Sequence, residues 1–101
     1  VIKKIKRIKN FKRKTIGILG VTFKAETDDT RDSLSLSLIK KLKKIKLKVI
    51  YTDVYYKDKY WHDFKSLITK SDIIILGAPH NKYKTIKVPK NKNLIDIWGI
   101  I

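Results

Sequence analysis

The sequence contains no cysteine. Within this chain, that absence excludes disulfides, thiolate metal sites and a cysteine nucleophile. No apolar run approaches the roughly 18 residues that a membrane-spanning helix needs. Residues 1–14 also lack the apolar core, of about 7–15 residues, that marks a secretory signal. We therefore expect a cytoplasmic protein with no membrane partner.

Acidic residues are scarce as well. There are 9 of them against 25 lysines and arginines, which gives a formal net charge of +16. Such a charge can indicate a nucleic-acid partner. However, only Arg7, Arg13 and Arg31 are arginines, and arginine provides the two-pronged contact that base and phosphate recognition favours. We therefore interpret the lysines as compositional bias and solvated surface, and we do not expect nucleic acid as a partner.

The N-terminal stretch carries much of the positive charge. Its apolar side chains recur every three to four residues, as in an amphipathic helix; they are Val1, Ile2, Ile5, Ile8 and Phe11. We expect residues 1–13 to form a basic linking helix and residues 14–101 to form one domain. The alternative is a basic interaction module that binds nucleic acid or an acidic membrane surface through residues 1–14.

The rest of the chain alternates strand and helix patterns. Short apolar runs predict strands at residues 15–19, 46–52, 73–76 and 94–97. These runs are continuous rather than alternating, which is typical of parallel strands covered on both faces. Helices are predicted between them, over 33–45 and 61–70, with a short one near 80–85. We therefore expect an α/β fold, a Rossmann-like doubly wound parallel sheet in a single three-layer domain.

Residues 33–45 fit two patterns. Serine and leucine alternate over 33–38, which alone predicts a strand. Leu34, Leu38 and Leu42 also follow a helical spacing, and Asp32 or Ser33 can cap a helix start. We favour the helix because its pattern covers twice as many residues.

The first predicted strand runs into a loop, residues 20–33, that is rich in charged and hydroxyl side chains. A loop between a parallel strand and a helix N-terminus is a common anion site. The glycines are spaced Gly17-x-x-Gly20, which is neither the dinucleotide fingerprint nor a P-loop. Asp53 closes the second strand as a ribose-binding acid would, but we interpret it as a strand-end turn residue.

This loop resembles the signature G-x-x-F-K-x-x-T-D-D-x-R-x-S, which opens the C-terminal UDP-binding domain of the UDP-glucose/GDP-mannose dehydrogenase family. The resemblance continues through residues 51–53 (Tyr-Thr-Asp), 71–72 (Ser-Asp), 80–83 (His-x-x-Tyr) and 95–96 (Ile-Asp). It covers residues 14–99.

The resemblance implies an NAD-dependent enzyme that oxidises a nucleotide sugar twice at C6, converting a UDP-hexose to a UDP-uronic acid. In that family an N-terminal domain holds NAD and a central domain carries the catalytic cysteine. This chain matches neither domain, so it is predicted to be inactive alone and to hold no catalytic residue. The implied partners are a UDP-sugar and the missing domains, in an enzyme that is a homo-oligomer when complete.

The resemblance also assigns binding residues. Phe23 and Lys24 are expected to contact the UDP-sugar, with Lys24 as the main ligand. Arg31 either binds phosphate or forms a salt bridge to an aspartate of the loop. His80 either lines the nucleotide cleft or caps the turn after Pro79.

Four further residues are expected to be loop scaffold: Gly20, Thr27, Asp28 and Asp29. Trp98 stands where some family members have an arginine that contacts the nucleotide sugar; it either stacks on a ring or belongs to the core or an interface. Neither His62 nor His80 has the neighbours of a metal site, and no metal site is expected.

Overall fold

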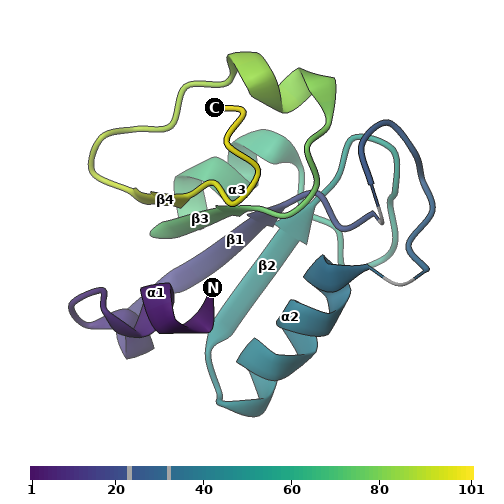
Figure 1. Cartoon of the computed structure of the whole chain (residues 1–101). Coiled ribbons are helices and arrows are strands. Elements are labelled where there is room, and N and C mark those ends of the chain that lie inside the picture. The colour runs from purple at the N-terminus through teal and green to yellow at the C-terminus, as the bar shows by residue number, and fades with distance from the viewer. Residues whose placement is uncertain (23, 32) are drawn as a thin grey trace.

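The computed structural model describes residues 1–22, 24–31 and 33–101. At its centre lies a parallel sheet of four strands in the order β2-β1-β3-β4 (Figure 1). Their bounds are β1 Thr15–Leu19, β2 Lys48–Thr52, β3 Ile73–Leu76 and β4 Asn93–Ile95. The predicted parallel sheet is confirmed, and β1 and β3 have the predicted bounds.

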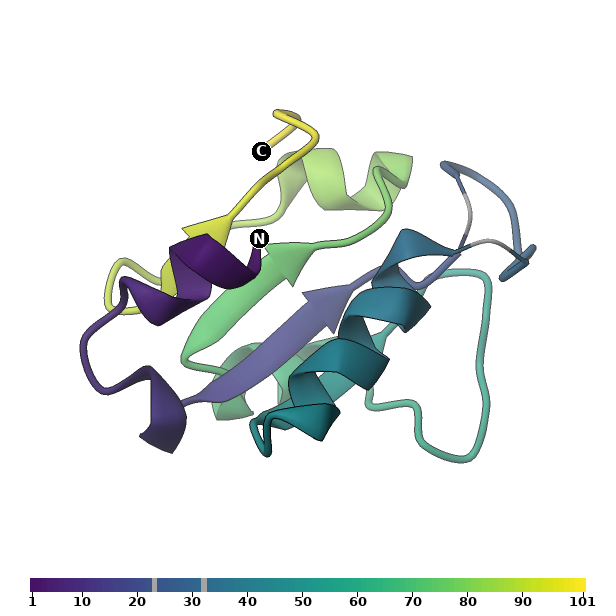
Figure 2. The same ribbon diagram turned by 60° about the horizontal axis from the view of Figure 1, so that its bottom comes forward.

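Helices cover both faces of the sheet. The α-helices are α1 (Ile2–Lys6), α2 (Leu34–Lys44) and α3 (Phe64–Lys70), and the 3₁₀-helices are η1 (Phe11–Arg13) and η2 (Asn81–Thr85). Figure 2 shows α1 and α2 on one face and α3 on the other. None of the helices described is long and apolar enough to cross a membrane.

The core is divided between the two faces of the sheet. Ile16, Ile18 and Ile75 pack with residues of α1 and α2 in one cluster, whereas Ile74 and Leu76 pack with α3 in the other. Because successive strand residues point to opposite faces, continuous apolar strands supply both clusters. The doubly wound, three-layer fold is therefore confirmed.

The helix predicted over residues 33–45 is confirmed as α2. Ser33 caps it, since its hydroxyl accepts a hydrogen bond from the Leu36 backbone N–H at 3.2 Å. The buried face differs from the predicted leucine stripe: Leu34 is 76% exposed, and Ser35 is buried. Ser35 can face the sheet because its hydroxyl donates to the Gly77 carbonyl at 3.0 Å. The other proposed cap, Asp32, lies outside the described residues.

Other elements are shorter than predicted, each for a local reason. Strand β2 starts at Lys48 because Lys46 has a left-handed φ of 64°. Helix α3 starts after Asp63, whose carboxylate accepts from the Ser66 N–H at 3.0 Å. Strand β4 ends at Ile95 because the Asp96 carboxylate accepts three backbone N–H groups of the following turn.

The N-terminal stretch is not one continuous helix. Helix α1 covers Ile2–Lys6, and the chain then turns through Asn10, which has a left-handed φ of 61°. A left-handed residue interrupts a right-handed helix. Ile5 is fully buried in the same cluster as α2, so this stretch packs on the sheet. The proposed boundary between residues 1–13 and 14–101 stays a prediction.

The order of the strands creates a switch point. From β1 the chain passes through α2 to β2 on one side, and then through α3 to β3 on the other. In open α/β sheets, ligands bind outside the carboxyl ends of the strands at such a point. The loop over residues 20–33 begins there.

Candidate functional site

The loop over residues 20–33 leaves the sheet through a tight passage at Gly20. Its φ is +92°, and an added Cβ would lie 2.6 Å from the Ala78 Cβ. The Gly20 N–H donates to the Thr52 carbonyl at 2.9 Å. Glycine is therefore required here for both backbone conformation and space, which fits the scaffold role expected of Gly20.

A buried carboxylate fixes the next residue of the loop. Asp53, at the carboxyl end of β2, accepts the Val21 N–H at 2.7 Å. It also accepts the N–H groups of Tyr55 at 2.8 Å and Tyr56 at 3.2 Å. As interpreted from the sequence, Asp53 is a turn residue, and it also ties β2 to the loop that follows β1.

His80 joins a third loop to this carboxylate. Its Nε2 lies 3.1 Å from Asp53 Oδ1 and 3.1 Å from Thr22 Oγ1. Its Nδ1 accepts the Glu26 backbone N–H at 2.9 Å. Because Nδ1 accepts, the proton of the neutral imidazole belongs on Nε2, where it is donated towards Asp53. His80 is fully buried, and its side chain caps no helix end.

Electrostatics favour the ionised form of Asp53. Burial by itself raises the pKa of this carboxyl, but the hydrogen bonds from His80 and from the backbone N–H groups of Tyr55 and Val21 outweigh it and lower the pKa overall. The carboxylate therefore stays charged at neutral pH and keeps accepting these donors.

Lys24 lies on the exposed side of the same loop. Its carbonyl accepts a hydrogen bond from the Thr22 hydroxyl at 3.0 Å, and Thr22 in turn contacts His80. The Thr22 hydroxyl thus fixes the backbone of Lys24, while the side chain of Lys24 is exposed. Its neighbour Phe23, the other expected contact, lies outside the described residues.

Arg31 is engaged within the loop itself. Its Nε donates to Asp29 Oδ1 at 3.0 Å and its Nη2 to Asp29 Oδ2 at 2.9 Å. The hydrogen bonds from Arg31 hold the pKa of Asp29 at about 2. Thr27 adds a further loop contact, since its hydroxyl accepts the Asp29 N–H at 3.2 Å, and Asp28 is exposed. The salt-bridge alternative for Arg31 is the one that the structure contains.

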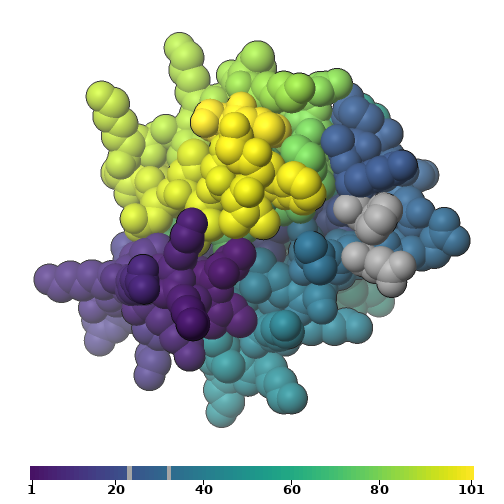
Figure 3. Space-filling model, in the orientation of Figure 1, coloured from purple at the N-terminus to yellow at the C-terminus, as the bar shows by residue number. Residues whose placement is uncertain are grey.

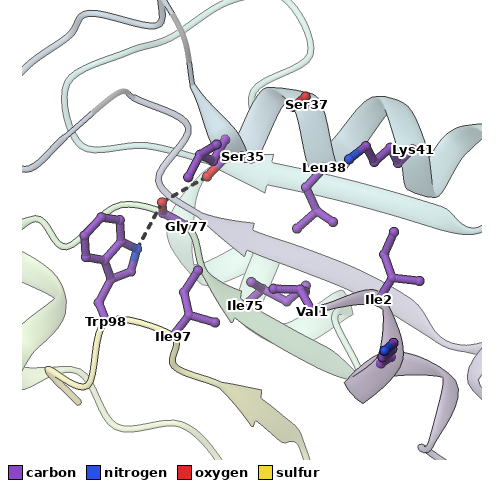
Figure 4. A pocket seen from close by; sticks show the side chains of 12 residues that line it. Val1, Ile2, Ser35, Ser37, Leu38, Lys41, Ile75, Gly77, Ile97 and Trp98 are labelled. Atoms are coloured by element: carbon purple, nitrogen blue, oxygen red, sulfur yellow. Dashed lines mark hydrogen bonds between the residues drawn. The ribbon is translucent and has the colours of Figure 1, made fainter.

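A groove lies beside this site, between α1, α2 and the segment after β4. Its volume is about 470 Å³. Ile75, Leu38 and Ile97, labelled in Figure 4, give it a mainly apolar lining. The N-terminal segment (purple), the C-terminal segment (yellow) and α2 meet around it in Figure 3. Trp98 forms one wall, 43% exposed, and its Nε1 donates to the Gly77 carbonyl at 3.3 Å.

The residues of this domain do not fit NAD. The turn after β1 lacks the glycine spacing that lets a backbone approach a pyrophosphate. Asp53, which would have to meet a ribose, is buried and already bonded to His80 and three backbone N–H groups. Among the residues that the structure describes, no group of three or more potential ligands could hold a metal ion.

Sequence reasoning missed the contribution of Thr22, Glu26 and Asp53 to the site. The available signal was positional: Thr22, Asp53 and His80 each follow one of three adjacent strands. Because the carboxyl ends of parallel strands share one edge, polar residues just after them meet.

Comparison with known proteins places these features in one family. Residues 17–101 match the family model described as the UDP-glucose/GDP-mannose dehydrogenase family, UDP binding domain. The UDP-N-acetyl-D-mannosamine dehydrogenase of Methanocaldococcus jannaschii is 31% identical over 96 residues, an alignment that covers 93% of this chain and 22% of that protein.

Solved structures agree in fold. The GDP-mannose dehydrogenase of Pseudomonas aeruginosa, solved as a ternary complex, is 26% identical with a TM-score of 0.75, over 88% of this chain and 25% of that one. The UDP-N-acetyl-mannosamine dehydrogenase of Staphylococcus aureus has a TM-score of 0.84 at 19% identity, over 99% of this chain and 26% of that one. The chain thus spans about a quarter of the length of these proteins.

Proposed function

Because this chain belongs to the UDP-glucose/GDP-mannose dehydrogenase family, over the part that is its UDP-binding domain, we propose that it holds the nucleotide diphosphate of a UDP-sugar. In the complete enzyme, this binding would serve the NAD-dependent oxidation of a UDP-hexose to a UDP-uronic acid.

In this proposal Lys24 is the main binding residue. Its side chain is exposed, and its carbonyl accepts a hydrogen bond from Thr22. Thr22 is in turn held by His80, which is hydrogen-bonded to Asp53. The loop leads into the N-terminus of α2, where the helix dipole favours an anion. A lysine ammonium at this place neutralises a diphosphate through charge-assisted hydrogen bonds. The exposed lysine on an anchored loop is the observation that carries the proposal.

The other expected binding residues take different parts. Phe23 is assigned to the UDP-sugar by its place next to Lys24 in the family signature. Arg31 contributes through its pair with Asp29, which supports a scaffold role with Thr27 and Asp28. His80 is buried, which supports action through the loop.

The chemistry of the oxidation belongs to other parts of the complete enzyme. This chain has no cysteine, and its residues do not fit NAD. We therefore assign NAD and the catalytic cysteine to the missing domains, which residues 1–13 would link to this one. By the same family resemblance, the complete enzyme would be a cytoplasmic homo-oligomer.

The test is a titration of the ¹⁵N-labelled chain with UDP-glucose, followed by NMR. We expect saturable shifts in the amides of residues 20–31 and a weaker effect of uridine, which lacks the diphosphate. The chain alone should reduce no NAD in the presence of UDP-glucose. Equal binding of uridine and UDP-glucose, or no binding of either, would contradict the proposed site.

A further inference from the structure

We propose that His80 is a positioning residue, which holds the Lys24 loop in its ligand-binding conformation through its hydrogen bonds to Thr22, Glu26 and Asp53. This inference rests on the proposed function for the role of Lys24. It concerns a residue that need not touch the ligand.

The imidazole of His80 lies where three loops meet. His80 comes from the loop after β3, Asp53 from the end of β2, and Thr22 and Glu26 from the loop after β1. All its hydrogen-bonding atoms are used: Nε2 meets Asp53 and Thr22, and Nδ1 accepts from Glu26. The ring is fully buried, so solvent does not compete for these bonds.

Two of these bonds bracket Lys24 in the sequence. Thr22 lies two residues before it and Glu26 two residues after it, and both are held by the same ring. Thr22 also holds the Lys24 carbonyl. Glu26 has a left-handed φ of 55°, a conformation that non-glycine residues seldom adopt without support. The bond to Nδ1 is the support that turns the Glu26 N–H inward.

The side chain of Glu26 adds a second connection. Its Oε2 lies 3.7 Å from Nδ1 of His80, and its Oε1 accepts from Asn81 Nδ2 at 2.7 Å. The backbone and the side chain of Glu26 therefore both tie the loop after β1 to the loop after β3.

Two tyrosines complete the surroundings of the ring. Tyr55 contacts the ring edge-on at 4.9 Å, and Tyr83 lies at 5.7 Å, both measured between ring centroids. The imidazole is thus fixed by packing as well as by its hydrogen bonds.

Two amide substitutions separate the two halves of the ring. In His80→Asn the side-chain oxygen can take the place of Nδ1 and accept from Glu26, whereas the reach to Asp53 is lost. In His80→Gln the terminal amide can donate to Asp53 in place of Nε2, whereas the acceptor for Glu26 is lost. His80→Ala removes both, and the midpoint of urea unfolding shows how far each variant remains folded.

The experiment measures UDP-glucose affinity by NMR titration of the wild type and these variants at neutral pH. Amide exchange at Glu26 is recorded on the same samples.

We expect His80→Gln and His80→Ala to bind UDP-glucose about fivefold or more weakly than the wild type, the effect of at least one lost hydrogen bond. His80→Asn, which keeps the acceptor for Glu26, should bind more tightly than His80→Gln. Equal affinity of His80→Gln and the wild type, or equal weakening in His80→Asn and His80→Gln, would overturn the inference.

The failure of the proposed function would look different. If the wild type bound no UDP-glucose, the function would fail, but amide exchange would still report on the loop. Faster exchange at Glu26 in His80→Gln than in His80→Asn would uphold the positioning role. Equal exchange in all the variants and the wild type would refute it.

Discussion

At the scale of single residues, the site depends on one glycine in a tight passage and on two buried polar side chains. Gly20 has a positive φ and sits against Ala78. Asp53 and His80 are buried polar residues whose hydrogen bonds are made with each other and with loop backbone. These residues do not present a chemical group to solvent. They fix the loop that does.

Gly20→Ala should destabilise the fold more than Gly99→Ala. Both glycines have positive φ, but an added Cβ meets Ala78 at Gly20 and nothing within 4 Å at Gly99. A left-handed alanine costs about 1 kcal/mol, and overpacking adds about 2 kcal/mol at Gly20. Urea unfolding of the two variants measures this difference, and equal free energies of unfolding would show that the contact with Ala78 is relaxed at no cost.

Arg31→Ala should raise the pKa of Asp29. The pair with Arg31 holds that pKa at about 2, so its contribution to stability is present above the ordinary pKa of an aspartate and is lost as the pH falls through about 2. In the variant the pKa should rise towards its ordinary value. NMR titration of the Asp29 carboxyl measures the shift, and an unchanged pKa in the variant would contradict the role of the pair.

At the scale of elements, α2 shows what a local pattern predicts and what it leaves open. The alternation of serine and leucine over residues 33–38 alone predicts a strand, yet α2 forms because Ser33 caps it and its buried residues pack on the sheet. The helical spacing predicted the element but not its buried face. Ser35 faces inward because its hydroxyl donates to the Gly77 carbonyl. No helical pattern in the sequence reveals this contact.

Ser33→Ala should destabilise the protein by about 1 kcal/mol, the usual cost of losing an N-cap. Ser37→Ala is the matched control: it lies in the same helix, is exposed, and should be neutral or slightly stabilising because alanine has the higher helix propensity. Both are measured by urea unfolding. A loss in Ser37→Ala as large as in Ser33→Ala would contradict the capping role.

The sequence predicts the strands of this fold better than the residues of its site. Buried parallel strands are continuous apolar runs in the sequence, so the bounds of β1 and β3 can be predicted to the residue. The partners of His80 are not, because Thr22 and Asp53 lie 58 and 27 positions away and meet it only through the strand order. The N-terminal stretch is not the continuous helix that its pattern predicts: α1 ends at Lys6, and the left-handed Asn10 precedes the separate turn η1.

At the scale of the whole molecule, the chain matches only part of the length of its relatives. It spans 22% of the length of the archaeal relative and contains no cysteine. Its net charge of +16 attracts any polyanion, so affinity for a diphosphate at low salt is weak support by itself. If the proposed site is correct, Lys24 contributes more to UDP-glucose affinity than the other lysines do, because buried contacts fix its loop.

The most direct measurement compares UDP-glucose affinity in Lys24→Ala and Lys44→Ala at the same ionic strength. Both variants lose one positive charge, and Lys44 lies at the far end of α2 from the loop. Loss of a charge-assisted contact should weaken binding about tenfold or more in Lys24→Ala, and Lys44→Ala should bind like the wild type. Equal weakening in both variants would mean that only net charge matters, and undiminished binding in Lys24→Ala would contradict the site itself.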